Sequence, residues 1–360
     1  MNQSRSQTIV MDGYGSYLGM EKGCFVVKDR KGEVERYPLL ENEIKEVVLR
    51  SGNSVSTGAL LSLGFWDIDV MVLTSRGRPV AMLKSLDDDN HVKTRLCQYD
   101  ALSNGKGVEI AKEIVLAKMR GQNSLLKKYD LKPHDENTIT LKIESLDPSN
   151  LETFRKRLTG IEGKFSEGYF RQIFGLLPEE LRPPKRRKFK AYDGVNNLFN
   201  LAYEVLSWKV HRAVVKAKLE PYLGFLHSVQ YGKPSLVCDL QELYRHLIDD
   251  FVISYSRGLS SKDFISKVES MSKSRKGNRL YLKDSLTRQM MGELDEYFQS
   301  KVGIPAMRHG KSQAFETLIS EEILLLAKHL RDEKKDWIPR TARSRFLLLN
   351  KSSLNRQAIV

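Results

Sequence analysis

The spacing of apolar residues changes near residue 90, and this change constrains the fold more than any other feature. Before it, short apolar or β-branched runs alternate with turn residues, which is typical of short strands. After it, Leu, Ala, Lys, Glu and Arg recur with the helical period of about 3.6 residues. We therefore expect an α+β protein with a β-rich, sandwich-like domain at 1–88, a larger all-α domain at 89–309 and a basic extension at 310–360.

The first domain is expected to hold six strands and one helix. The helix is predicted at Ser56–Leu63, with Ser54 or Ser56 as its N-cap. Arg76–Pro79 is predicted to turn the chain between the last two strands. The strands are expected at Thr8–Met11, Cys24–Val27, Val34–Leu39, Ile44–Leu49, Ile68–Leu73 and Val80–Leu83.

The remainder is expected to be mainly helical, because apolar residues recur there at helical spacing. The helices are predicted at His91–Ser103, Gly107–Tyr129, Asn150–Leu158, Gly163–Leu176, Val195–Lys218, Leu236–Ser254, Ser261–Met271, Leu280–Ser300 and Glu316–Asp332.

The charge and composition of the chain favour some classes of function over others. A formal net charge of +14 favours a polyanionic partner, nucleic acid first. No apolar run approaches the roughly 18 residues that span a bilayer, and the N-terminus has no apolar signal core, so a cytoplasmic protein is expected. Three cysteines without a CxxC pair indicate reduced thiols and argue against a zinc finger.

The segment Leu181–Lys190 is expected to be a basic loop. Two prolines stop a helix there, and six basic residues follow or flank them. The segment either binds phosphates or is a solvated linker, since basic runs occur in both roles. The candidate DNA-binding residues are Arg182, Lys185, Arg186, Arg187 and Lys188.

Asp239 and Glu242 are three residues apart on a predicted helix that begins near Ser235. At that spacing both carboxylates lie on one helix face. Two carboxylates so close repel each other unless a positive group lies between them. A divalent cation or Arg245 would serve, and the alternative is a pair of solvated surface acids.

His227 and Glu162 are the other candidates for chemistry. His227 lies in an apolar, glycine-containing segment, and Glu162 lies between Gly160 and Gly163. Each residue taken singly is more often structural or surface-exposed. Taken together, carboxylates plus one imidazole without a thiolate form a hard donor set that suits Mg²⁺ or Mn²⁺. In a basic protein such a set favours nuclease, polymerase or transposase chemistry.

At these segments the sequence resembles the CRISPR-associated integrase family, the Cas1 proteins. The likeness spans about residues 7–300, and its motifs occur in family order. The resemblance implies that Glu162, His227 and Glu242 bind the divalent metal, with Asp239 as a further ligand or a positioning group. The motifs are Gly160–Gly163, Val195–Leu206, Leu219–His227, and Pro234–Glu242 followed by Arg245.

The resemblance also implies a reaction and partners. Family members insert spacer DNA into CRISPR arrays by transesterification, in which the 3′-hydroxyl of a prespacer attacks a phosphodiester at the repeat. They dimerise through the N-terminal part and assemble with a dimer of the companion Cas2 protein. Two alternatives stay open at this point. One is a transposon-encoded integrase, a casposase, that acts on terminal inverted repeats, and the other is a non-catalytic DNA-binding scaffold.

Overall fold

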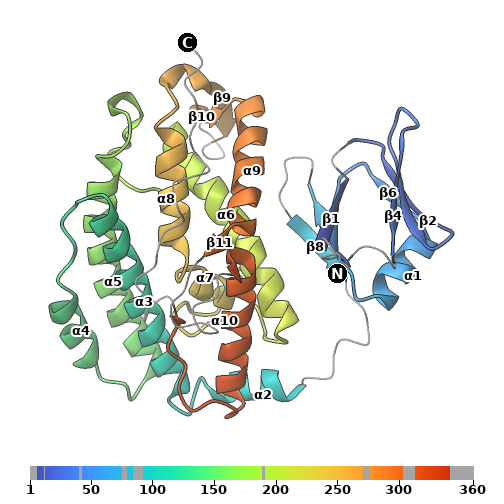
Figure 1. The fold of residues 1–360 in the computed structure, drawn as a ribbon. Coiled ribbons are helices and arrows are strands. Elements are labelled where there is room, and N and C mark those ends of the chain that lie inside the picture. The colour runs from blue at the N-terminus through green and yellow to red at the C-terminus, as the bar shows by residue number, and fades with distance from the viewer. Residues whose placement is uncertain are drawn as a thin grey trace. The chain divides into compact units, whose positions relative to one another are not determined.

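The computed structural model forms two compact units, Met1–His91 and Val92–Val360, which are described separately (Figure 1). No helix in the described part of the chain has the length and apolar character of a bilayer-crossing segment. The structure describes residues 6–11, 13–39, 43–74, 79–83, 92–188, 191–270, 276–302 and 313–340.

The first unit contains two four-stranded sheets, in the orders β1-β5-β7-β8 and β4-β3-β2-β6. In the first sheet, β1 and β7 both run parallel to β5, and β8 is antiparallel to β7. All six predicted strands are present, and β2 and the two-residue β6 were not predicted. The strands are β1 Ser6–Met11, β2 Tyr17–Glu21, β3 Cys24–Lys28, β4 Val34–Pro38, β5 Glu43–Arg50, β6 Ser54–Val55, β7 Asp69–Leu73 and β8 Pro79–Leu83.

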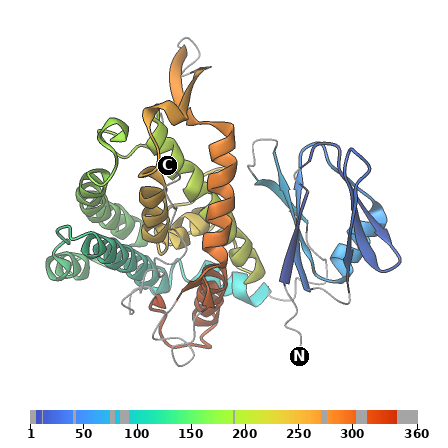
Figure 2. The same ribbon diagram turned by 45° about the horizontal axis from the view of Figure 1, so that its top comes forward.

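The two sheets share one core, as expected for a sandwich (Figure 2). Leu18 and Phe25 from one sheet and Val47 from the other are fully buried in the same cluster. The helix α1 (Thr57–Phe65) covers part of this core, and its N-cap is Ser56, whose hydroxyl accepts a 3.1 Å hydrogen bond. The predicted turn at Arg76–Pro79 falls mainly outside the described residues.

The second unit is mainly helical, which confirms the α+β class. Its long helices α3, α5, α6, α8 and α10 bury their apolar faces in one core (Figure 1). The elements are α2 Val92–Asp100, α3 Lys106–Lys128, α4 Glu136–Glu144, α5 Leu151–Phe174, α6 Gly194–Lys216, α7 Ser235–Gln241, α8 Arg245–Ser256, β9 Phe264–Ser270, β10 Lys276–Leu282, α9 Asp284–Gln299, β11 Lys301–Val302, β12 Gln313–Ala314 and α10 Phe315–Leu330.

Two predicted helix boundaries were wrong near the site. The helices expected at 150–158 and 163–176 are one continuous helix, α5, so Gly160 and Gly163 are helical rather than a turn. Conversely, the helix expected at Leu236–Ser254 is divided into α7 and α8 by a turn at 242–244. Glycine lowers helix stability without forbidding the conformation, so a long apolar stripe overrides it.

The helix predicted at Ser261–Met271 is also wrong. Ser260 and Asp263 form a capping box, but the helix that it starts is a single 3-10 turn. From Phe264 the chain forms the antiparallel hairpin of β9 and β10. The apolar residues of this stretch, Phe264, Ile265 and Val268, are also compatible with helical spacing, so the strand is set by its pairing with β10 rather than by a local period.

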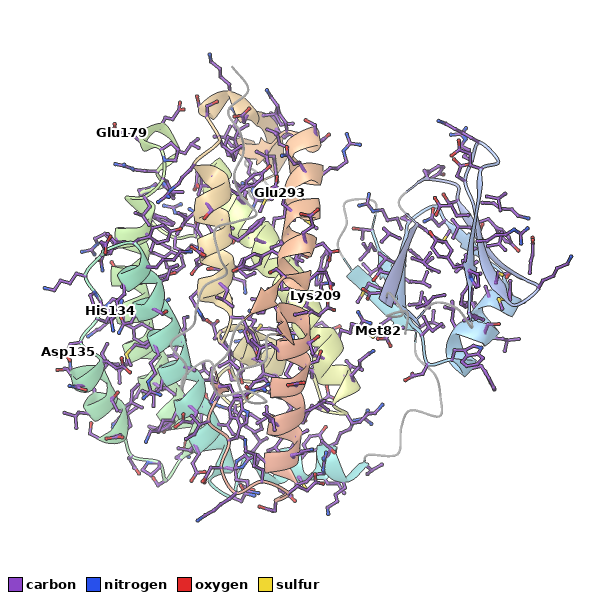
Figure 3. The ribbon with its side chains drawn as sticks, in the orientation of Figure 1. Met82, His134, Asp135, Glu179, Lys209 and Glu293 are labelled. Carbon is purple, nitrogen blue, oxygen red and sulfur yellow. The ribbon has the colours of Figure 1, made fainter. Side chains whose placement is uncertain are left out.

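The described part of the C-terminal segment belongs to the core of the second unit. Within α10, Phe315, Ile319 and Ile323 are fully buried. Lys209, labelled in Figure 3, lies on α6. Its ammonium lies 3.0 Å from Glu316 on α10 and 3.2 Å from Asp295 on α9. The sequence analysis set residues 310–360 apart as an extension, whereas α10 packs as an integral helix; residues 341–360 lie outside the described part.

Candidate functional site

Three segments of the second unit supply the predicted site residues. Glu162 lies in the middle of α5, and Glu242 is the C-cap residue of α7. His227 lies in the loop between α6 and α7, and Asp239 lies on α7. Glu242 and Asp239 are buried, whereas the side chains of Glu162 and His227 keep 18% and 30% of their surface. The site is therefore a buried acidic centre with one side open to solvent.

The Lys118 ammonium joins Glu162 to Glu242. Lys118 lies on α3, and its side chain is 7% exposed. Its Nζ contacts Glu162 Oε1 and lies 2.7 Å from Glu242 Oε2. Ser166, one turn further along α5, donates a 2.8 Å hydrogen bond to the same Glu162 oxygen. Two carboxylates that are 80 residues apart in the sequence thus share a single cation.

A second cation, Arg245, holds the other oxygen of Glu242. Its Nη1 lies 2.7 Å from Glu242 Oε1, and its guanidinium lies 4.7 Å from the centre of the Tyr203 ring. Burial alone would raise the pKa of Glu242. The charges of Arg245, Lys118 and His227, in that order, outweigh burial and lower this pKa to about 2. Glu242 is therefore ionised at neutral pH.

Asp239 organises the loop that carries His227. Its Oδ2 accepts backbone hydrogen bonds from Phe225 (2.5 Å) and Leu226 (2.9 Å), and its Oδ1 accepts one from His227 (2.8 Å). The same Oδ1 lies 2.7 Å from His227 Nδ1. An ionised carboxylate only accepts, so the ring carries a proton on Nδ1, and when the imidazole is neutral its Nε2 keeps a lone pair for another partner.

The loop before His227 is fixed closely against α7 and α5. A Cβ on Gly224 would lie 2.8 Å from Asp239 Oδ2 and 2.8 Å from the carbonyl carbon of Ser235, so no side chain fits there. From α5, the Arg155 guanidinium donates to the carbonyls of Gly224 (2.6 Å) and Phe225 (2.5 Å). The imidazole is consequently positioned by backbone contacts on two sides.

Among the described residues, no three His, Cys, Asp or Glu side chains are already arranged to hold a metal ion. The geometry explains this, because the Lys118 ammonium occupies the position between Glu162 and Glu242. Glu242 Oε2 nevertheless accepts no hydrogen bond of acceptable geometry within the described chain, although the ammonium lies 2.7 Å away. A buried carboxylate oxygen without a well-formed hydrogen bond is suited to bind a metal cation directly.

The basic loop divides into anchoring and exposed side chains. The Arg186 guanidinium turns inward and donates to Asn196 Oδ1 (3.0 Å) and Asn200 Oδ1 (2.7 Å). Arg182 Nε donates 2.9 Å to the carbonyl of Leu177. Arg186 therefore stabilises the protein itself. Among the five predicted DNA-binding residues, Arg182, Lys185 and Lys188 are exposed, and Arg186 and Arg187 are half-buried.

Lys118, which contacts both Glu162 and Glu242, was not predicted from the sequence. It lies one turn before Gln122 on α3, and both polar side chains are buried on a face that otherwise carries apolar residues such as Ile114, Val115 and Leu125. The signal that could have identified Lys118 is a charged residue on the apolar face of a long helix. An isolated buried charge is costly unless it is paired.

The comparisons with known proteins agree on one family. The family model described as "CRISPR associated protein Cas1" matches residues 9–291. The CRISPR-associated endonuclease Cas1 of Korarchaeum cryptofilum is 30% identical over 280 residues, or 73% of this chain and 81% of that protein. A Cas1 endonuclease of Archaeoglobus fulgidus is 33% identical over 266 residues, which cover 68% of this chain and 76% of that one.

Solved structures share the fold at lower identity. A casposase bound to its integration product has a TM-score of 0.75 at 20% identity and covers 97% of both chains. A CAS1 protein from Thermotoga maritima has a TM-score of 0.70 at 20% identity, over 90% of this chain and 97% of that one. A chain of a Cas6-RT-Cas1–Cas2 complex has a TM-score of 0.70 at 20% identity, over 94% of this chain and 36% of that one.

Proposed function

We propose that this chain, which belongs to the CRISPR-associated Cas1 family, joins DNA at the site formed by Glu162, His227 and Glu242. As a member of this family, the chain is a nuclease that acts as endonuclease and integrase in CRISPR spacer acquisition. One observation supports the assignment of the site: Glu162 and Glu242, from separate helices, converge on one cation, the Lys118 ammonium.

Glu162, His227 and Glu242 would hold Mg²⁺ or Mn²⁺. Two carboxylates and the Nε2 lone pair of an imidazole are hard donors that suit these ions. The ionised state of Glu242 and its poorly satisfied Oε2 support this choice. When bound, such an ion polarises a phosphate oxygen and neutralises charge that develops during phosphoryl transfer. Asp239 serves as a positioning residue, since its oxygens already accept four contacts.

The reaction is a transesterification in which the 3′-hydroxyl of a prespacer attacks a phosphodiester at the repeat boundary. A new P–O bond forms while an existing one breaks, and the released strand keeps the departing oxygen as its 3′-hydroxyl. No protein nucleophile is required because the DNA end attacks. His227 lies on the open side of the site, where its Nε2 can bind the metal or accept the proton of the attacking hydroxyl.

Basic side chains would hold the DNA backbone beside this site. The net charge of +14 makes binding salt-dependent. Arg182, Lys185 and Lys188 are exposed and suit phosphate contacts, whereas the Arg186 guanidinium already binds Asn196 and Asn200. We further propose that the chain acts in the cytoplasm as a homodimer formed through the first unit. A dimer of the companion Cas2 protein would join two such dimers.

A casposase remains the alternative substrate class within the same chemistry. The likeness to the casposase structure covers 97% of this chain, but it concerns the fold alone at 20% identity. Terminal inverted repeats as the preferred DNA ends would identify that class. A non-catalytic scaffold is disfavoured because Glu162, His227 and Glu242 are all present and grouped.

Glu162→Gln tests the site. The protein is incubated with a 3′-hydroxyl oligonucleotide, Mn²⁺ and a plasmid with or without a repeat, in the presence or absence of the companion protein. We expect E162Q to lower joining by about 10²–10³-fold, the usual cost of losing a charge that stabilises the transition state.

The matched control is Glu167→Gln, on the same helix. Glu167 pairs with Arg171 on the surface, and its side chain is 73% exposed, so E167Q should join DNA like the parent chain. Joining by E162Q at the parental rate would remove the catalytic assignment. Preference for inverted-repeat ends over the CRISPR repeat would move the chain to the casposase class.

A further inference from the structure

The acidic centre is electrically balanced without a metal. Glu162 and Glu242 supply two negative charges, and Lys118 and Arg245 supply two positive charges at ion-pair distance. Lys118 and Glu242 are buried, with side-chain exposures of 7% and 5%. A divalent cation added to this arrangement would leave two excess positive charges in a buried volume, and uncompensated buried charge is strongly destabilising.

Arg245 and Lys118 differ in how readily a metal ion could displace them from the carboxylates. The Arg245 guanidinium binds Glu242 Oε1 at 2.7 Å and also lies over the Tyr203 ring, so it has two partners that hold it in place. Lys118 contacts the two carboxylates through a compact ammonium on a flexible stem. It also leaves Glu242 Oε2 without a hydrogen bond of acceptable geometry within the described chain. Lys118 is therefore the cation that can be replaced.

We propose that Lys118 is the internal counter-ion of the metal-free site, and that its ammonium and a divalent cation bind between Glu162 and Glu242 in a mutually exclusive manner. The inference rests on the proposed function in one respect, because it takes these two carboxylates as metal ligands. Two consequences follow. Lys118 keeps the acidic centre folded before the metal arrives, and it weakens the metal affinity by competing for the same oxygens.

Lys118→Met removes the charge while keeping the apolar stem. In EDTA, K118M should melt at a lower temperature than the parent chain, because Glu162 and Glu242 then repel each other with only Arg245 to compensate. Saturating Mn²⁺ should raise the melting temperature of K118M more than that of the parent chain. Mn²⁺ binding, followed by electron paramagnetic resonance, should tighten about tenfold if the ammonium occupies the site about 90% of the time.

Lys128→Met is the matched control. Lys128 lies on the same helix and forms a similar ion pair, 2.6 Å from the buried carboxylate of Asp250. K128M should lower the melting temperature equally in EDTA and in Mn²⁺, and it should leave the Mn²⁺ affinity unchanged. The control distinguishes the general effect of losing a buried ion pair from the specific effect of losing the ion pair at the acidic centre.

A second measurement uses the parent chain and so does not depend on the folding of K118M. Reductive methylation followed by mass spectrometry reports the reactivity of each lysine amine. Lys118 should be protected in EDTA and should react several-fold faster with Mn²⁺, while the reactivity of Lys128 stays constant. Equal protection of Lys118 in both conditions would overturn the proposal.

The outcomes also separate this inference from the proposed function. If K118M binds Mn²⁺ equally or more weakly than the parent chain, Lys118 does not compete and the inference is wrong. If the parent chain and K118M both fail to bind Mn²⁺, the metal site itself is wrong, and with it the proposed chemistry. DNA joining does not enter either measurement.

Discussion

Glu242 and Asp249 are both buried and lie seven residues apart, yet their surroundings differ in kind. Glu242 contacts two cations, and their charges overcome the effect of burial to lower its pKa to about 2. Asp249 accepts hydrogen bonds from the hydroxyls of Tyr169 (2.7 Å) and Tyr203, and burial raises its pKa to about 6. Burial therefore does not identify a functional acid, whereas the type of partner does.

The contrast assigns different roles to the two acids. Tyrosine hydroxyls satisfy Asp249 by hydrogen bonds and fix α5, α6 and α8 together, so this carboxylate is structural. Ion pairs keep Glu242 charged while leaving one of its oxygens without a well-formed hydrogen bond among the described residues. The second environment suits an exchangeable cation. Variants at the two positions should consequently fail in different assays.

The largest expected effect is the loss of joining in Glu242→Gln. The amide keeps the shape but loses the charge that would bind the metal, so joining should fall by about 10²–10³-fold. Asp249→Asn should join DNA at close to the parental rate. The oligonucleotide-joining assay on both variants, with circular dichroism to verify folding, checks the contrast. Similar loss in both variants would contradict it.

An intermediate loss of metal affinity and of joining is expected in Asp239→Asn. Its oxygens accept four contacts from N–H groups of the loop, and an amide can accept on only one side. His227 would lose its fixed ring orientation, which typically costs about 10–100-fold in metal affinity or activity. Mn²⁺ titration of D239N measures this. Unchanged affinity and joining would show that His227 does not need Asp239.

The smallest effect on joining is expected in Asp249→Asn, which should instead change the pH dependence of stability. Because the folded-state pKa of Asp249 is raised to about 6 from 3.8, the folded protein binds more protons between these values than the unfolded chain. The free energy of unfolding should therefore fall as pH rises from about 4 to about 6, and D249N should lack this contribution, which is about 3 kcal/mol for a shift of this size. Urea denaturation at several pH values provides the measurement; an equal slope in both proteins would argue against it.

The sequence predicted the class of the fold because both units follow simple periodicities. Short apolar or β-branched runs between turn residues predicted six strands of the first unit, and Ser56 was one of the two serines proposed as the N-cap of α1. Errors arose where a local signal conflicted with tertiary packing. Gly160 and Gly163 indicated a turn, but they lie within α5. The helix predicted at Ser261–Met271 is limited to the single 3-10 turn that the capping box of Ser260 and Asp263 starts.

At the site, residue types on single elements were predictable and pairings between elements were not. Glu162, His227 and Glu242 were named from spacing and resemblance. The contact of Lys118 with Glu162 and Glu242 depends on how α3 packs against α5 and α7. No local pattern encodes that packing. The inward turn of Arg186 has the same origin, since its partners Asn196 and Asn200 lie on α6.

The most direct measurement is an anomalous difference map from a crystal of the protein soaked in Mn²⁺. A single strong peak bounded by the carboxylates of Glu162 and Glu242 and by His227 Nε2, with the Lys118 ammonium moved away, is the predicted result. A peak elsewhere, or no peak while Lys118 still bridges the two carboxylates, would contradict the claim that these side chains form the metal site.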